Sequence, residues 1–205
     1  MFQAPIRARM RRTVSHAAHV GALKATLFMA ASIACVTLSA QAVTAQTFLT
    51  LEQAPKAVFP EADSFEQRKI TSSAELRAEV LRLVGRKPSI WEPFYYAYIA
   101  KRGGEIIGYA IVCEEIGRDR PITYIVAANA GGDVKDVAVM TYRETRGGEV
   151  RYRAFTRQFK GKSLRNPIQG QGDIRNITGA TLSVRAMATG VRKALAVIQL
   201  TVMKG

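Results

Sequence analysis

The chain has 205 residues, of which 48% are hydrophobic and 22% charged, a composition typical of one globular domain with an extension. It excludes a wholly disordered chain, a collagen-like chain and a polytopic membrane protein. The 30 basic and 16 acidic side chains give a net charge of +14, which raises nucleic acid or an anionic membrane as a partner. Residues 1–45 hold five basic and no acidic side chains, and residues 46–150 hold 14 basic and 15 acidic side chains. Residues 151–205 hold 11 basic side chains and one acidic side chain. Each basic region therefore needs its own explanation.

The first 45 residues have the pattern of an export signal. A basic leader precedes an uncharged run between Lys24 and Glu52, whose first part, ATLFMAASIACVTLSA, is small and apolar. The run contains Ala40-Gln41-Ala42 and Val43-Thr44-Ala45, both of the small-x-small type that signal peptidase cleaves. We predict a removable signal peptide over residues 1–45 and a mature domain over 46–205, located in the periplasm or at the outer face of the cytoplasmic membrane. An uncleaved anchor stays open as the alternative, because about 20 apolar residues can span a bilayer.

The predicted mature domain has one thiol and no histidine, because Cys35, His16 and His19 lie in the leader. A single cysteine cannot form an internal disulfide, and Cys113 is expected to be a buried small hydrophobe in a strand. The lack of histidine removes His-based catalytic triads, His-ligated haem and most zinc sites. We therefore expect no metal site.

The apolar patterns predict an α+β fold with a mostly antiparallel, twisted sheet flanked by helices. A short helical pattern within residues 47–63 ends at Phe59-Pro60, and a second helix begins at Ser73. Four strands joined by turns are expected to follow, over residues 91–102, 105–115, 121–130 and 134–144. A C-terminal helix is expected from near Leu182, with apolar side chains at Val184, Met187, Val191, Leu195, Ile198 and Val202.

The segment NITGATLS, which starts at Asn176, precedes this last helix and combines hydroxyls with a glycine turn. The N–H groups at a helix start are unpaired and lie at the positive end of the helix dipole, so they favour a phosphate. The small side chains of Gly179 and Ala180 would let a bulky group approach the backbone. Chemistry alone favours an ordinary N-cap, because Thr is a common capping residue.

The same segment resembles the S/T-G-A-T flavinylation sequence of the FMN-binding domain found in the G-type subunits of Rnf complexes and the C-type subunits of sodium-pumping quinone reductase. In that family the last Thr of the motif carries FMN through a phosphoester bond. Residues 143–148, RETRGG, resemble the family's E-T-P-G-L-G segment, which lies beside the flavin ring, and residues 159–162, FKGK, match a later GK-containing stretch. The resemblance covers about residues 104–200, with the motifs in the family's order.

The resemblance implies covalent FMN on Thr181, at the turn that precedes the C-terminal helix. It places the other cofactor-binding residues at Thr178, Gly179 and Ala180 around the phosphate, at Glu144, Thr145 and Gly147 beside the ring, and at Lys162. The chain departs from the family where Arg146, Gly148 and Glu149 replace Pro, Leu and Gly. It also has Arg175 six residues before Thr181, where the family has an acid, and its nearest acid is Asp173.

These observations predict an exported flavoprotein that passes electrons between membrane or periplasmic redox partners, a carrier rather than a turnover enzyme. An unactivated threonine is a poor nucleophile, so the resemblance implies a separate Mg²⁺-dependent flavin transferase as a partner. A flavin-dependent reductase of a small substrate is a further possibility, but no general acid or base accompanies the motif. The charge of residues 151–205 predicts a basic docking face for an acidic redox partner or anionic lipid headgroups.

The alternative is an exported basic binding module for an anionic partner, an acidic protein or lipid, without flavin. It depends on basic and aromatic residues between 151 and 165. The alternation in RYRAF is expected to place Arg151 and Arg153 on one side of a strand, with Tyr152 on the other. Export makes nucleic acid a poor candidate partner for either function.

Overall fold

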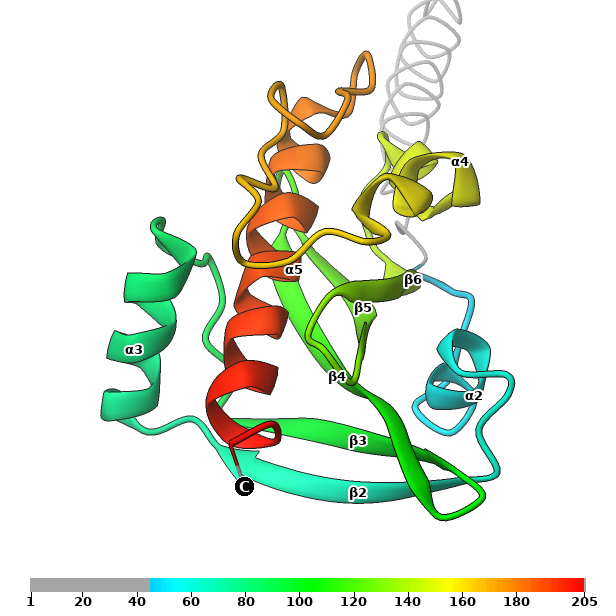
Figure 1. The fold of residues 1–205 in the computed structure, drawn as a ribbon. Helices are drawn as coiled ribbons and strands as arrows, with labels where there is room; N and C mark the ends of the chain where they lie inside the picture. Colours follow the sequence, from blue (N-terminus) through cyan, green and yellow to red (C-terminus); the bar gives the residue numbers. More distant parts are fainter. Residues whose placement is uncertain (1–44, 205) are drawn as a thin grey trace, which may run out of the picture. The chain divides into compact units, whose positions relative to one another are not determined.

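A computed structural model describes residues 45–204, so the predicted signal peptide lies outside the described residues apart from Ala45. Within this part the strands form one antiparallel sheet in the order β1-β6-β5-β4-β3-β2 (Figure 1). The strands are β1 (Gln46–Thr47), β2 (Ser64–Thr71), β3 (Phe94–Arg102), β4 (Glu105–Ile116), β5 (Pro121–Asn129) and β6 (Val134–Tyr142). Consecutive strands from β2 to β6 pair with one another, and β1 closes the far edge against β6.

Helices cover both faces of the sheet (Figure 1). They are α2 (Ala54–Val58), α3 (Ala74–Val84), α4 (Arg153–Thr156) and α5 (Thr181–Thr201), with 3₁₀ turns at η1 (Gly148–Arg151) and η2 (Arg157–Phe159). The long helix α5 packs against β4, β5 and α3, whereas α2 packs against β5 and β6. The predicted α+β class, with an antiparallel sheet and a C-terminal helix, is confirmed.

Local sequence explains where the predicted helices begin and end. Ser73 caps α3, because its hydroxyl accepts the N–H of Leu76 at 3.2 Å. Gly85 ends α3 in the left-handed conformation, at φ 72°, which glycine adopts without strain. Pro55 lies in the first turn of α2, and the Phe59-Pro60 sequence ends that helix.

Each face of the sheet has its own hydrophobic core. On the α5 face, Tyr95, Ile111 and Val126 lie in one buried cluster with the apolar side of the helix. On the opposite face, Phe59 packs with Ile125 and the α2 residues. Because β3, β4 and β5 are covered on both faces, their sequences read as nearly continuous apolar runs rather than as alternating patterns.

A buried lysine joins α5 to the sheet and to the segment before β3. Lys193 is fully buried, and its Nζ lies 3.0 Å from carboxylate oxygens of Glu92 and of Glu115. The same ammonium donates to the carbonyl oxygens of Ile90 and Glu114 at 2.9 and 2.8 Å. Glu92 also accepts the N–H of Glu114 at 2.7 Å, and β3 begins after this residue, at Phe94 rather than at the predicted Trp91.

The strand predicted for RYRAF is wrong. Arg151 ends the 3₁₀ turn η1, and Arg153 begins the short helix α4. The reason is the four-residue spacing of Phe155 and Phe159, which places both rings on one side of a helical turn. The ring centroids are 5.5 Å apart, and both side chains are buried. The two arginines therefore do not share one face of a strand.

Among residues 45–204, no helix combines the length and the apolar character that crossing a membrane requires.

Candidate functional site

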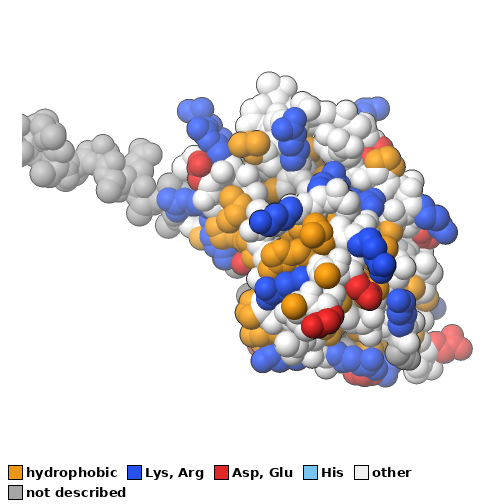
Figure 2. All heavy atoms as spheres, turned by 90° about the vertical axis from the view of Figure 1, so that its left-hand side faces the viewer, with side chains coloured by type: hydrophobic (Ala, Val, Ile, Leu, Met, Phe, Trp, Pro, Cys, Tyr) orange, Lys and Arg blue, Asp and Glu red, His pale blue; other side chains and the backbone are white. Residues whose placement is uncertain are grey.

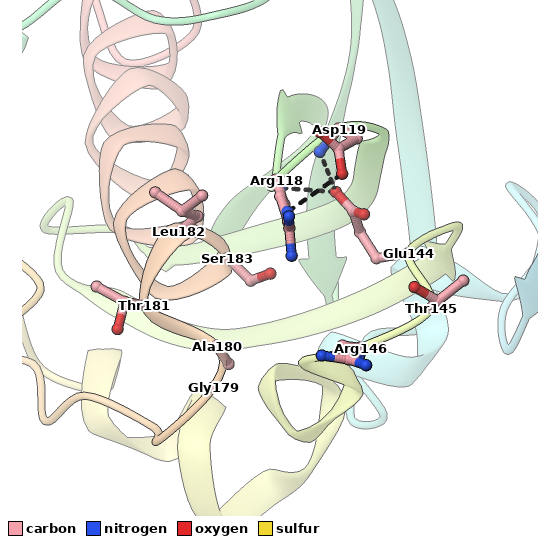
Figure 3. Close-up of a pocket in the computed structure, with 10 residues that line it drawn as sticks. All are labelled: Arg118, Asp119, Glu144, Thr145, Arg146, Gly179, Ala180, Thr181, Leu182 and Ser183. Atoms are coloured by element: carbon pink, nitrogen blue, oxygen red, sulfur yellow. Dashed lines mark hydrogen bonds and ion pairs between the residues drawn. The ribbon is translucent and has the colours of Figure 1, made fainter.

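A pocket of about 920 Å³ lies at the N-terminal end of α5 (Figure 3). Three segments that are distant in sequence line it. They are Gly179–Ser183 at the start of α5, Glu144–Arg146 after β6, and Arg118 with Asp119 in the turn between β4 and β5. Five of the predicted site residues therefore meet here: Glu144, Thr145, Gly179, Ala180 and Thr181.

Thr181 is the first residue of α5, and its side chain is partly exposed in the pocket. The Nδ2 group of Asn176 donates a hydrogen bond to Thr181 Oγ1 at 2.8 Å, so the hydroxyl oxygen is held in one orientation. Gly179 turns the chain in front of it at φ 80°, and a β-carbon built there would have no neighbour within 4 Å. The hydroxyl therefore lies beside open space that a ligand can enter.

The start of α5 leaves its backbone donors free. The first bond within the helix joins the Val184 N–H to the Ala180 carbonyl at 2.9 Å. The N–H groups of Thr181–Ser183 have no acceptor inside the helix, and Ala180 provides no side-chain cap. With the positive end of a 21-residue helix dipole, these groups can bind an anion such as a phosphate.

Gly147 holds the segment after β6 against this helix start. A β-carbon on Gly147 would lie 3.0 Å from Tyr142 Oη and 3.1 Å from Ala180 Cβ. The phenol of Tyr142 donates to the Arg146 carbonyl at 2.5 Å and lies 3.2 Å from Ser183 Oγ. Burial raises the pKa of Tyr142, an effect that the hydrogen bond with Ser183 partly offsets. The phenol therefore stays protonated and ties the two segments together.

Glu144 lines the pocket, and its carboxylate is bonded to the turn between β4 and β5. One carboxylate oxygen, Oε1, accepts the backbone N–H groups of Arg118, Asp119 and Arg120 at 2.6, 2.7 and 2.9 Å. The side chain thus binds the turn between β4 and β5, and its contacts with that turn define one wall of the pocket (Figure 3).

The pocket lining also includes residues that the sequence patterns did not mark for the site: Arg118, Asp119, Arg146, Leu182 and Ser183. Arg118 and Asp119 form an exposed ion pair at 3.4 Å, and Leu182 is 48% exposed. No sequence signal marks the turn residues, because they lie about 60 residues from the motif and meet it only through the order of the strands. The exposed Leu182 could have been noticed, since it breaks the apolar pattern of α5.

The other three predicted site residues, Gly147, Lys162 and Thr178, are not among the residues that line the pocket. The ammonium of Lys162 pairs with the Asp173 carboxylate at 2.9 Å, and that carboxylate also accepts the Gln169 N–H at 2.7 Å. Burial acts to raise the pKa of Asp173, but the Gln169 N–H and Lys162 outweigh it, and the net shift is downward. Lys162 thus fastens the loop that leads to the motif.

The remaining sequence expectations concern metals and the thiol. Within residues 45–204, no group of three or more His, Cys, Asp or Glu side chains could hold a metal ion. Cys113 is buried in β4, and burial raises the pKa of its thiol well above the ordinary value. It therefore behaves as a small hydrophobe, as expected.

Comparison with known proteins gives matches over the same part of the chain. Residues 117–196 match the FMN-binding domain family. The chain is 26% identical over 152 residues to the G subunit of the Na⁺-translocating ferredoxin:NAD⁺ oxidoreductase complex of Acetobacterium woodii, with 69% of this chain and 70% of that protein covered.

Two further relatives match over a shorter range. The G subunit of the proton-translocating ferredoxin:NAD⁺ oxidoreductase complex of Clostridium ljungdahlii is 30% identical over 105 residues, which cover 48% of this chain and 57% of that protein. The G subunit of the ion-translocating oxidoreductase complex of Shewanella loihica is 35% identical over 118 residues, which cover 49% of this chain and 53% of that protein. The chain thus spans little more than half the length of these two relatives.

Proposed function

Because residues 117–196 match the FMN-binding domain family, we propose that this chain is an exported flavoprotein that carries FMN covalently on Thr181. In this proposal it passes electrons between membrane or periplasmic redox partners. The observation that carries the proposal is the convergence of two motif segments, Glu144–Arg146 and Gly179–Ser183, on one pocket at the start of α5. The partners are proposed by analogy with the relatives, whose names describe subunits of ion-translocating oxidoreductase complexes.

The residues present in the pocket fit a flavin phosphate attached to Thr181. The free N–H groups of Thr181–Ser183 point to a phosphate site beside the hydroxyl, and the open space at Gly179 admits the attached group. The exposed Leu182 offers an apolar contact to a ring, and the volume lies in the range of small-molecule sites. When bound, the flavin supplies a ring that accepts and releases electrons, and the chain fixes its position and its electrostatic surroundings.

Attachment needs a partner, because the group that contacts the Thr181 hydroxyl is not a base. Its oxygen accepts a hydrogen bond from Asn176, an amide that cannot remove the hydroxyl proton. In this proposal the activation comes from a flavin transferase that moves FMN from FAD onto Thr181 and releases AMP, with Mg²⁺ to neutralise the charge of the leaving AMP. The partly exposed hydroxyl at the mouth of an open pocket supports access for such an enzyme.

A carrier role is favoured over turnover of a small substrate by the bonding of the acidic groups in the pocket. The Oε1 atom of Glu144 is occupied by three backbone donors, and Asp119 pairs with Arg118. Both carboxylates are therefore engaged in contacts within the protein, and proton transfer to a small substrate would have to break one of these contacts.

A basic face supplies a docking surface for an acidic redox partner or anionic lipid headgroups. Figure 2 shows the side of the molecule that carries α3, where Lys and Arg side chains border a hydrophobic patch on several sides and Asp and Glu side chains lie at its lower edge. Arg86 and Arg192 line a shallow pocket there with Arg165, and both clamp the loop at Pro167 through its backbone carbonyls. Such a face accelerates encounter with an anionic partner at low salt, and the acceleration declines as salt is added.

The alternative, a basic module without flavin, has less support. Several of the basic side chains it depends on already have carboxylate partners: Arg153 with Asp136, Lys162 with Asp173 and Arg165 with Asp133. These pairs lower the positive field of residues 151–165 and leave no continuous cationic strand face for a ligand.

The test is co-expression with a flavin transferase, followed by intact-mass measurement and peptide mapping. The wild-type protein should gain the mass of one FMN moiety on the peptide that contains Thr181. Thr181→Val should abolish the gain, and Thr189→Val, at a partly buried threonine further along α5, should retain it. An unchanged wild-type mass, or a flavin on another peptide, would contradict the proposal.

A further inference from the structure

The turn between β4 and β5 is the one wall of the pocket that neither motif contains. It spans Gly117–Arg120, and the Gly117 N–H bonds the Arg120 carbonyl at 2.9 Å. Three successive N–H groups of this turn point at one oxygen of Glu144. Successive backbone N–H groups that converge in this way form an anion-binding concavity, and here the anion is a side chain of the same protein.

Gly117 leaves the space in which the Glu144 carboxylate lies against the turn. A β-carbon on Gly117 would lie 2.9 Å from Glu144 Oε1 and 3.1 Å from the Cδ1 atom of Ile122. Any side chain at this position would push the carboxylate out from under the turn. Charge-assisted hydrogen bonds to a carboxylate are stronger than neutral ones, so the three bonds fix the turn relative to the end of β6.

The fixed turn carries Arg118 into the pocket. Its guanidinium extends into the space between Ser183 and Glu144 (Figure 3). The side chain is 69% exposed, and its carboxylate contact within residues 45–204 is Asp119 at 3.4 Å, which is also exposed. Arg120 belongs to the same turn but does not line the pocket. One arginine of the turn thus faces the site and the other does not.

We propose that Glu144 is a positioning residue, which holds the Gly117–Arg120 turn so that Arg118 faces the bound flavin ring. In this position the charge of Arg118 favours the reduced form of the flavin. The proposal rests on the proposed function. A flavin that takes up two electrons and one proton gains a net negative charge. A guanidinium that the fixed turn carries to the ring stabilises that charge by electrostatic attraction. Arg146, on the other side of the pocket, adds to the positive field, and Asp119 opposes it.

The first test compares Arg118→Gln with Arg120→Gln, which removes the same charge from the same turn outside the pocket. The readout is the equilibrium constant for reduction of the flavin-loaded protein against a reference dye. Arg118→Gln should lower it by about tenfold, which is about 30 mV for a two-electron couple. Arg120→Gln should change it by less than about threefold, because its charge is solvated and lies outside the site. Equal effects of the two variants would overturn the role of Arg118.

The second test is a double-mutant cycle, because the charge of Glu144 itself also acts on the ring. In a Glu144→Gln background, Arg118→Gln should have less than half its effect on the logarithm of the equilibrium constant. Arg146→Gln should have the same effect in both backgrounds, since Tyr142 holds the Arg146 backbone independently of Glu144. Additive effects of the Glu144 and Arg118 substitutions would show that Glu144 does not act through the turn.

A third measurement needs no flavin. In the flavin-free protein, Glu144→Gln should raise the hydrogen-exchange rates of the Arg118, Asp119 and Arg120 amides at least tenfold, with core amides of β5 unchanged. Gly117→Ala, which displaces the carboxylate from the other side, should do the same and serves where Glu144→Gln folds poorly. Unchanged exchange in both variants would overturn the positioning role. A missing mass increase contradicts the proposed function, whereas a normal mass with unshifted reduction constants contradicts only this inference.

Discussion

Gly147 packs against Ala180, so that the segment after β6 touches the residue that precedes α5. The contact brings the two motif segments together, because Gly147 belongs to RETRGG and Ala180 belongs to NITGATLS. Gly147 also has a φ of 79°, which side chains disfavour. The close contact and the backbone conformation both require glycine. Their contributions to stability can be separated experimentally.

Gly147→Ala should destabilise the protein by about 2–3 kcal/mol and reduce the flavin attached in co-expression. Backbone strain contributes about 1–2 kcal/mol, and the β-carbon meets Tyr142 Oη and Ala180 Cβ. Gly161→Ala is the matched control, because Gly161 has a φ of 76° but a β-carbon added to it would have no neighbour within 4 Å. Chemical denaturation measures both. An equal loss in the free energy of unfolding in the two variants would show that the close contact between Gly147 and Ala180 does not contribute to stability.

Asn176→Ala should slow flavin attachment severalfold while leaving the free energy of unfolding nearly unchanged. Asn176 is exposed, and its bond to Thr181 Oγ1 orients the hydroxyl rather than supporting the core. The measurement is the rate of mass gain with purified transferase and FAD, together with thermal unfolding. A wild-type attachment rate would mean that the transferase orients the threonine without help from this amide.

Gly190→Ala should destabilise the protein, although alanine is normally the better helix former. A β-carbon at Gly190 would lie 1.5 Å from Tyr124 Oη and 2.5 Å from its Cζ, and overpacking of this kind costs about 1–3 kcal/mol or more. Gly131→Ala is the control, since its β-carbon would contact only Asn129 Oδ1 at 3.4 Å. A stabilised Gly190→Ala protein would show that α5 shifts on the sheet without cost.

Lys193→Met should lower the free energy of unfolding by about 3–5 kcal/mol, because it leaves the buried carboxylate of Glu115 and the largely buried carboxylate of Glu92 without a counter-ion. Lys204→Met, an exposed substitution, should have almost no effect. The triple variant with Glu92→Gln and Glu115→Gln should recover part of the loss, since no net charge then remains buried. Failure of the triple variant to recover would locate the cost in packing instead.

Asp173→Asn should destabilise the protein by about 1–2 kcal/mol at pH 7, through loss of hydrogen bonds to a charged acceptor. The lowered pKa of Asp173 means that its contribution exists above the unfolded-state value of about 4 and disappears as the pH falls through the folded-state value. The difference between wild type and variant should therefore shrink as the pH falls below about 4, which denaturation at several pH values measures. A constant difference would contradict the ionic role.

The sequence predicted the elements whose own residues contain a strong pattern. The cap at Ser73 and the apolar spacing along α5 define those helices locally, and Gly103-Gly104 marks the turn between β3 and β4. By contrast, β2 was not predicted, because it is an edge strand whose sequence, SFEQRKIT, is mostly charged or polar. Charged edges of this kind discourage pairing with other chains, so their lack of an apolar pattern has a physical cause.

The candidate site was predictable only where the motifs lie. The sequence context predicts Thr181 and Glu144 as site residues, and both line the pocket. The bond of Glu144 to the turn at Gly117, by contrast, depends on the register of three strands. No local pattern encodes that register. The same limit applies to Lys162, whose partner Asp173 is set by a loop conformation and not by residue spacing.

The order of the elements along the chain determines when the site can form during synthesis. Strands β2 to β6 pair in the order in which they are made, so their contacts are local and form early by the usual relation between topology and folding rate. The pocket, however, needs the Thr181 end of α5 to dock beside the finished end of β6, and α5 follows every strand of the sheet in the chain. A cofactor-attaching enzyme that reads this surface would therefore act only on chains that have been synthesised through this helix.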